Sequence, residues 1–195
     1  MIQKVQAIFA ASIEAKRRFI EENAERLVAV VELVVETFAS GRKLFLFGNG
    51  GSAADAQHIA AEFVNRYQRE RAPLPAIALT TDGSVLTSVS NDSSFEDVFA
   101  RQLRALGAAG DAALALSTSG RSPNVIRALE VCREMGIRTV GLTGGEGSGG
   151  AMADRVDYLL RVPVDSTPRI QEAHLVIGHA ICELAEEILA GRGVG

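Results

Sequence analysis

The chain has 195 residues, of which 47% are hydrophobic and 23% are charged, and its formal net charge is −4. This composition predicts one globular domain with a large apolar core, and the negative charge weighs against nucleic acid as a partner. The N-terminal segment carries acidic residues, and no stretch approaches the ~20 apolar residues of a membrane span, so we expect a cytoplasmic protein without a membrane partner. Cys132 and Cys182 lack the spacing of a redox pair, and we interpret both as small buried apolar side chains.

Helical and strand patterns alternate along the chain. Apolar residues recur at spacings of three and four before Gly41, which predicts a helix over about the first forty residues. Short apolar runs typical of buried parallel strands follow at 43–48, 75–80, 111–117, 137–143 and 156–163. Helical patterns separate or follow them at 53–67, 84–105, 123–135 and 168–190.

The alternation predicts the fold class. Strands that alternate with helices form crossover units, and such units build a parallel sheet. We therefore expect an α/β protein with a five-stranded, doubly wound parallel sheet, helices on both faces and an N-terminal helical extension, all in one domain over residues 1–195. Ligands of such sheets bind beyond the carboxyl ends of the strands, so the segments that directly follow the strands are the candidate sites.

A glycine-rich segment, Gly48 to Ser52, follows the first predicted strand and is called the glycine loop below. Glycines let the backbone approach a ligand, and the next helix adds unpaired N–H groups at its positive end. The loop therefore predicts a phosphate site, whereas the alternative is a tight turn with Ser52 as the helix N-cap. A dinucleotide site is a weaker interpretation, because no acidic residue stands about twenty residues on, at the end of the second strand.

A hydroxyl-rich segment, Ser117 to Ser122, follows the third predicted strand and is called the hydroxyl loop below. Ser122 is a good N-cap and Pro123 suits the first helical position, so a helix should begin there. Capping uses one hydroxyl and leaves Ser117, Thr118 and Ser119 unexplained. Hydroxyl donors beside a helix N-terminus suit an anion, which favours a phosphate site over a simple turn.

Two groups of polar residues indicate metal and acid–base chemistry. His58, Glu62 and Arg66 are four residues apart and share one face of a predicted helix. His58 and Glu62 suit one divalent metal ion, although a solvated stripe of ion pairs is the alternative. The residues around them are mostly apolar, which favours a partly buried site.

The second group stands near the C-terminus and contains Arg169, Gln171, Glu172, His174 and His179. Eight residues separate Gln171 from His179, which is ~12 Å along one regular helix. Either the helix begins irregularly near Gln171, or the two side chains serve different protomers. We therefore predict an active site at a subunit interface.

Taken together, these residues resemble the phosphoheptose isomerase family, whose fold is the sugar isomerase (SIS) domain. The resemblance covers essentially the whole chain, and its segments are GNGGSAADAQHIAAEF, PAIALTTDGSVLTSVSND, GDAALALSTSGRSPNVIRAL, VGLTGG and RIQEAHLVIGH. It implies a cytoplasmic homotetramer, with residues 1–40 packing on the domain and between subunits. It also implies one zinc ion per subunit and conversion of sedoheptulose 7-phosphate to D-glycero-D-manno-heptose 7-phosphate, early in nucleotide-activated heptose synthesis.

The resemblance also assigns residues to roles. The zinc ligands on matching positions are His58, Glu62, Gln171 and His179. The expected substrate contacts are Asn49, Gly50, Gly51, Ser52, Arg66, Asn91, Asp92, Ser117, Thr118, Ser119, Ser122 and Gln171. Glu62 is the expected base that removes the proton beside the carbonyl, and His179 carries the second proton transfer or protonates the ring oxygen.

One departure and two alternatives accompany this assignment. Pro168 stands where some members of the family carry an acidic residue directly before the arginine of RIQE. A group with the same fold binds the bacterial replication initiator DnaA, and this chain resembles it in NRYQRERAPLPAIALTTD and RQLRALGAAGD. Glu62 and His179 favour the isomerase. A sugar-phosphate-sensing regulator is a third interpretation, but such proteins usually attach a DNA-binding domain. The final heptose product, whether lipopolysaccharide, an S-layer glycan or another, stays open.

Overall fold

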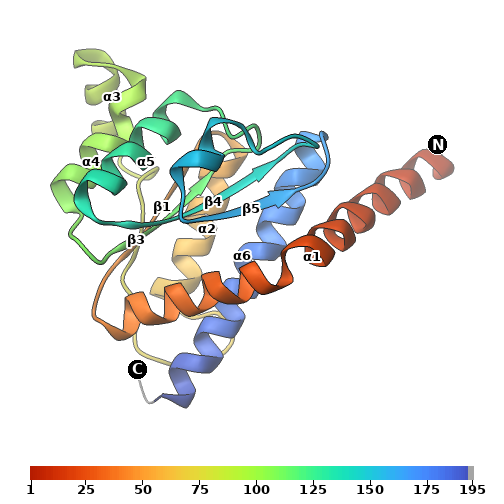
Figure 1. Cartoon of the computed structure of the whole chain (residues 1–195), viewed down its shortest axis with the longest axis horizontal. Coiled ribbons are helices and arrows are strands. Elements are labelled where there is room, and N and C mark those ends of the chain that lie inside the picture. The colour runs from red at the N-terminus through yellow and green to blue at the C-terminus, as the bar shows by residue number, and fades with distance from the viewer. Residues whose placement is uncertain (193–195) are drawn as a thin grey trace.

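The computed structural model describes residues 1–192. Its strands form one sheet in the order β2-β1-β3-β4-β5, and every neighbouring pair is parallel. The strands are β1 (Leu44–Gly48), β2 (Ala76–Ala78), β3 (Ala112–Leu116), β4 (Arg138–Gly144) and β5 (Tyr158–Val162). The helices are α1 (Ile2–Ala39), α2 (Gly51–Val64), α3 (Gly83–Asp92), α4 (Val98–Leu106), α5 (Pro123–Met135) and α6 (Thr167–Gly191), with short 3-10 helices at Phe95–Asp97 and Gly150–Arg155. The predicted five-stranded, doubly wound α/β fold is thus confirmed (Figure 1).

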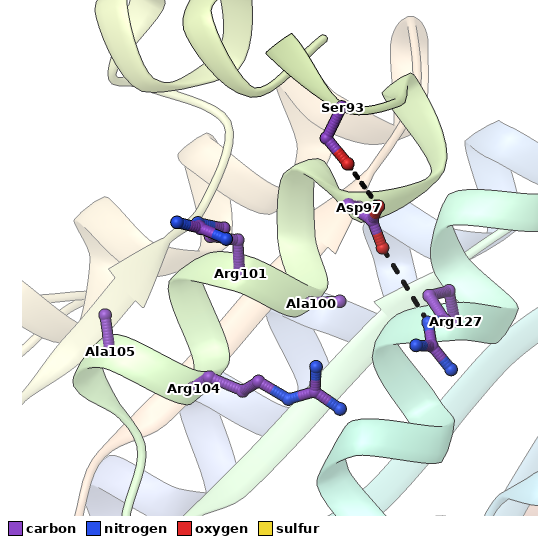
Figure 2. A pocket seen from close by; sticks show the side chains of 7 residues that line it. All are labelled: Ser93, Asp97, Ala100, Arg101, Arg104, Ala105 and Arg127. Carbon is purple, nitrogen blue, oxygen red and sulfur yellow. Dashed lines mark hydrogen bonds and ion pairs between the residues drawn. The ribbon is translucent and has the colours of Figure 1, made fainter.

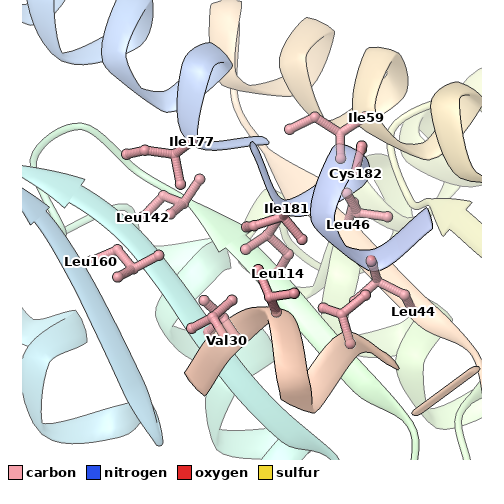
Figure 3. Close-up of a cluster of buried hydrophobic side chains, with 14 of the residues drawn as sticks. Val30, Leu44, Leu46, Ile59, Leu114, Leu142, Leu160, Ile177, Ile181 and Cys182 are labelled. Carbon is pink, nitrogen blue, oxygen red and sulfur yellow. The ribbon is translucent and has the colours of Figure 1, made fainter. Parts of the chain in front are cut away.

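Alternating side chains of the strands build two separate cores. Leu44 and Leu46 of β1 belong to the cluster formed with α1, α2 and α6. Phe45 and Phe47 belong to the cluster on the other face, formed with α4 and α5. Because successive side chains of a strand point to opposite faces, one apolar run fills both layers. Figure 3 shows the first cluster, where Ile181 of α6 meets the strand side chains.

The glycine and hydroxyl loops lie side by side because β1 and β3 are neighbours. Gly48 and Leu116, the last residues of these strands, are paired in the sheet. The chain leaves β1 toward β2 and leaves β3 toward β4, so the strand order reverses between them. The crevice at such a reversal is the usual ligand site of a doubly wound sheet.

Two predicted helices differ from the structure. The helical pattern over 84–105 is broken at Ser93 and Ser94, where Ser94 caps a new 3-10 helix through its bond with the Glu96 N–H. The pattern over 53–67 ends early, because α2 stops at Val64 and an irregular segment over 65–75 leads to β2. Side-chain hydrogen bonds to the backbone favour such ends over continued helix.

Helix α1 has two unlike halves. Its second half is buried against the sheet and α6, with Val30 and Val34 almost fully enclosed. Its first half extends away from the body (Figure 1), and Phe9 and Ile13 are 67% and 66% exposed. No helix within residues 1–192 is both long enough and apolar enough to cross a membrane.

Candidate active site

The closest polar contact between α2 and α6 joins two histidines. The Nε2 atoms of His58 and His179 are 2.9 Å apart, so one ring donates a hydrogen bond and the other accepts it. The helices approach this closely because residue 178 is glycine: a Cβ there would collide with the Ile59 side chain. Histidines 121 residues apart in the sequence therefore meet at one helix crossing.

Glu62 completes what we call the histidine cluster: His58, Glu62 and His179. The Glu62 carboxylate lies 3.5 Å from the Nε2 atom of His58, as the spacing of four residues on α2 predicts. The Glu62 side chain is 23% exposed and the His58 side chain 45% exposed. The cluster thus lies at an opening of the surface, where a ligand can reach it.

The donor set of the histidine cluster fits a metal ion of the zinc type. As they stand, no three histidine, cysteine, aspartate or glutamate side chains within residues 1–192 are arranged to hold one, because the two imidazoles contact each other directly. Two nitrogens bound tetrahedrally to zinc at 2.0–2.1 Å are about 3.3 Å apart. The observed separations are 2.9 Å between the two imidazole nitrogens and 3.5 Å between the His58 nitrogen and a Glu62 oxygen.

Two further residues lie beside the cluster and were not predicted from the sequence as site residues, Tyr67 and Asp55. The Tyr67 ring lies 5.7 Å from the His179 ring. The Asp55 carboxylate is one helical turn before His58, and its buried Oδ2 atom has no hydrogen-bond partner among the described residues. Burial raises the pKa of this carboxyl above its ordinary value, and the nearby His58 offsets part of the rise. The i, i+3 spacing of Asp55 and His58 could have indicated Asp55 from the sequence. Nothing in the sequence places Tyr67 against α6.

Gln171 lies against the glycine loop rather than against the histidines. A Cβ at Gly51 would collide with the Gln171 side-chain amide, so the loop passes directly over it. Helix α6 is regular from Thr167, which rules out the irregular helix start considered above. Helix α2 has its N-cap at Gly50, whose φ is +56°, and Ser52 is buried in the first turn instead of capping it.

The two loops are joined by a reciprocal amide pair. Asn49 and Asn124 each donate a hydrogen bond of 2.8 Å to the other. In the hydroxyl loop, the Oγ atoms of Ser117 and Ser122 are 2.9 Å apart. Ser122 does precede α5 and Pro123 does open it, but the Ser122 hydroxyl makes no capping bond to the helix. It contacts the Ser117 hydroxyl instead.

A cavity of about 400 Å³ adjoins the hydroxyl loop. Thr118, Ser119 and Arg121 line one side, and the glycine-rich turn after β4, with Asp165, Thr167 and Ile170, lines the other. Hydroxyl and guanidinium side chains thus line one space with the Asp165 carboxylate, and the hydroxyls and Arg121 are groups that suit a phosphate ester.

The remaining predicted site residues lie elsewhere in the chain. Arg66 pairs with Glu70 at 3.0 Å on the surface. Asn91 and Asp92 are exposed at the end of α3, which Figure 1 shows projecting away from α2 and α6. One chain therefore does not bring them to the histidine cluster.

The polar residues near the C-terminus do not all lie at the site. His174 is fully buried, bonds to the Thr143 carbonyl at 3.1 Å, and has its pKa lowered to about 4 by burial. It is a neutral core residue, whereas Arg169 pairs with Glu172 at 2.8 Å. Of the two C-terminal histidines, only His179 joins the site.

A second pocket, of about 480 Å³, lies between α4 and α5 (Figure 2). Its arginines are largely matched by acids: Arg104 pairs with Glu134, and Arg127 lies 3.7 Å from Asp97. The pocket contains none of the predicted site residues and is separate from the histidine cluster.

Comparison with known proteins gives consistent results. The family model described as SIS domain matches residues 8–144. The phosphoheptose isomerase of a Roseiflexus species is 58% identical over 92% of this chain and 90% of its own length. That of Aquifex aeolicus is 49% identical over 98% of this chain and 100% of its own length. The solved phosphoheptose isomerase of Neisseria gonorrhoeae superposes with a TM-score of 0.89 at 42% identity, covering 96% of this chain and 100% of that one.

Proposed function

This chain belongs to the phosphoheptose isomerase family of SIS-domain proteins, and on that basis we propose that it converts sedoheptulose 7-phosphate to D-glycero-D-manno-heptose 7-phosphate. It is an enzyme of the aldose–ketose isomerase class. The single observation that carries the proposal is the convergence of His58, Glu62 and His179 where α2 crosses α6.

The reaction moves a carbonyl from C2 to C1 through an enediol. In the forward direction Glu62 removes a proton from C1, and the C2 carbonyl oxygen takes up a proton. The enediol then loses the proton of its C1 hydroxyl, and a proton is delivered to C2, which gives the aldose. His179 exchanges protons with these oxygens or with the ring oxygen, and the partly buried position of the Glu62 side chain supports its use as a base.

The substrate phosphate is proposed to bind at the hydroxyl loop. The hydroxyls of Ser117, Thr118, Ser119 and Ser122 donate to it, and Ser52 lies at the start of α2 beside them. Asn49, Gly50, Gly51 and Gln171 contact the sugar hydroxyls. The Asn49–Asn124 pair, which ties the two loops together, supports this division.

A zinc ion, one per subunit, is proposed for the histidine cluster. Two imidazoles and a carboxylate at 2.9 Å and 3.5 Å supply three suitable ligands. Gln171 is the proposed fourth ligand, and a second protomer would have to supply it, because the Gln171 of the same chain lies against the glycine loop. When bound, the ion polarises the carbonyl oxygen and stabilises the negative charge that develops on it.

The site is proposed to be completed by a second copy of the chain within a cytoplasmic homotetramer. Asn91 and Asp92 stand on α3, away from the histidine cluster of their own chain, so a partner's α3 would have to supply them. The exposed apolar side chains on the first half of α1, among them Phe9 and Ile13, support the α1 region as a subunit contact. Arg66 stays a proposed substrate contact, which requires its release from Glu70.

The rival proposal, binding of the replication initiator, is not favoured by the relatives, whose names are those of the isomerase. The decisive experiment incubates the protein with sedoheptulose 7-phosphate, with and without a chelator, and follows aldose formation by NMR. We expect the aldose only without chelator. Capture of the initiator by a protein that forms no aldose would overturn the proposal in favour of the rival.

A further inference from the structure

The irregular segment after α2 is held by one buried carboxylate. The Glu186 side chain on α6 is 3% exposed. Its carboxylate accepts backbone hydrogen bonds from Tyr67 at 3.0 Å, Gln68 at 2.8 Å and Arg69 at 2.9 Å. Three consecutive N–H groups therefore converge on a single side chain from a helix more than a hundred residues away.

Arg71 connects the same carboxylate to the end of α2. Its Nε atom donates to Glu186 at 3.0 Å, and both side chains are almost fully buried, at 4% and 3% exposed. Its other nitrogens donate to the backbone carbonyls of Phe63 and Glu62, each at 2.8 Å. These carbonyls belong to the last turn of α2, where a cation also complements the helix dipole. The ion pair thus fastens the end of α2 to α6.

Stability alone is a weak reason for this arrangement. Burial by itself would raise the pKa of Glu186, but the three N–H groups and Arg71 outweigh it and hold the pKa below its ordinary value. The carboxylate is therefore charged and satisfied. A buried ion pair, however, gains little over well-packed apolar side chains, because removing two charges from water offsets their attraction. Geometry is the property that apolar side chains would not reproduce.

The ion pair lies next to the histidine cluster on both helices. On α2, Arg71 binds the carbonyl of Glu62 itself. On α6, Glu186 is about two turns beyond His179, on the same side of the helix. Between them, Tyr67 is held through its own N–H by Glu186 and places its ring 5.7 Å from the His179 ring.

We propose that Arg71 and Glu186 are positioning residues: they fix α2 against α6 and so set the separation of His58, Glu62 and His179. This inference rests on the proposed function only in naming the reaction that the cluster performs. Without the pair, the end of α2 and the Tyr67 ring lose their common anchor, and the cluster spreads.

The first test compares Glu186→Gln with Leu189→Ala in the full-length protein. Leu189 is a buried core residue one turn further along α6 and contacts neither the segment over 65–71 nor the cluster through a hydrogen bond, so its truncation destabilises without loosening the anchor. We expect Glu186→Gln to lower kcat about 10- to 100-fold with KM changed less than about twofold. Leu189→Ala should keep wild-type kcat at an equal or larger loss of Tm. Equal kcat for Glu186→Gln and wild type, or equal losses in both variants, would overturn the proposal.

The second test does not depend on activity. In metal-free protein with labelled histidines, the ring protons of His58 and His179 should give a nuclear Overhauser contact that weakens in Glu186→Gln and persists in Leu189→Ala. Arg71→Lys is the milder variant, because lysine keeps the charge but cannot reach Glu186 and two carbonyls together; it also serves if Glu186→Gln does not fold. An unchanged contact in either anchor variant would overturn the proposal. If the wild-type protein shows no isomerase activity, but the histidine contact is present in it and weakened in Glu186→Gln, only the proposed function is refuted.

Discussion

Two parts of the molecule carry predicted site residues, and they differ in how much of them the chain itself buries. Helix α2, with His58 and Glu62, buries five of its residues and packs on α6 through Ile59 and Gly178. Helix α3, with Asn91 and Asp92, has no buried residue at all. The first part is packed within one chain, whereas the second is an exposed element that we propose to act beside another copy of the chain. The comparison separates the chemistry that we propose for α2 and α6 from the assembly that we propose to complete it.

The largest expected effect is the loss of kcat on substitution of Glu62, on helix α2. Glu62→Gln removes the proposed base and should lower kcat about 10²- to 10⁴-fold. Steady-state kinetics with sedoheptulose 7-phosphate measures it, and substrate binding by calorimetry should be retained. Glu36→Gln is the matched control, because Glu36 is an exposed carboxylate on α1 outside the predicted site, and it should leave kcat near wild type. Near-normal turnover by Glu62→Gln would remove Glu62 from the mechanism.

The next largest effect is expected at Gly178, where α6 crosses α2. Gly178→Ala adds a methyl group that collides with Ile59, so the helices must part, at a cost of about 1–3 kcal/mol in unfolding free energy and about 10²-fold in kcat. Chemical denaturation and kinetics measure the two losses. Gly191→Ala is the control on the same helix, since a Cβ at 191 meets no atom of residues 1–192 within 4 Å. Equal behaviour of the two variants would show that the close approach at Gly178 does not set the cluster.

A substitution on the exposed helix α3 should lower turnover, and a second chain should restore it. Asp92→Asn should leave the unfolding free energy within about 0.5 kcal/mol, because the side chain is exposed, yet reduce turnover. Co-expressed with Glu62→Gln chains, it should regain activity, since an intact cluster then meets an intact α3 from the other chain. Mixed oligomers that remain as inactive as either parent would place both residues in one chain's site.

A smaller effect concerns assembly through α1. Phe9→Ser removes an exposed apolar side chain and should reduce the mass measured by light scattering from a multiple of 20.6 kDa toward smaller species. Glu32→Gln, an exposed position on the packed half of α1, is the control and should not change the mass. An unchanged mass for Phe9→Ser would exclude this part of α1 from the subunit contact.

The smallest effect is on stability in acid. Because the folded-state pKa of Glu186 is lowered from 4.5, the charged carboxylate contributes stability above that value and loses it as the pH falls through the folded-state pKa. The Tm difference between wild type and Glu186→Gln should therefore be largest at neutral pH and shrink below about 4.5. Parallel thermal melts at pH 7 and pH 3 measure it. A difference that grows in acid would contradict the assignment.

Much of the site could be predicted because its signals are local in sequence. The apolar runs fixed both central strands, and the loops that follow them could be located from glycines and hydroxyls alone. The spacing of His58 and Glu62 gave their common helix face. The family resemblance supplied the pairing with His179, which no local pattern contains.

Other features could not be predicted, because they depend on contacts between distant segments. Nothing near Arg71 in the sequence indicates Glu186, and the end of α2 at Val64 depends on that contact. The break at Ser93 was hidden, because no glycine or proline interrupts the helical pattern there. Likewise, a glycine at position 178 lowers helix propensity, and the sequence alone gives no reason for it. The structure gives the reason, because the Ile59 side chain occupies the space that a Cβ would need.

The central claim is that two imidazoles and one carboxylate of a single chain hold the ion that the reaction uses. It is tested most directly by adding zinc to metal-free protein and measuring bound metal by mass spectrometry alongside turnover, for wild type, His58→Gln and His179→Gln. We expect turnover to rise with bound zinc and to level off at one ion per chain, and we expect both variants to lose tight binding. Full turnover by metal-free wild type, or undiminished zinc binding in both variants, would contradict the claim.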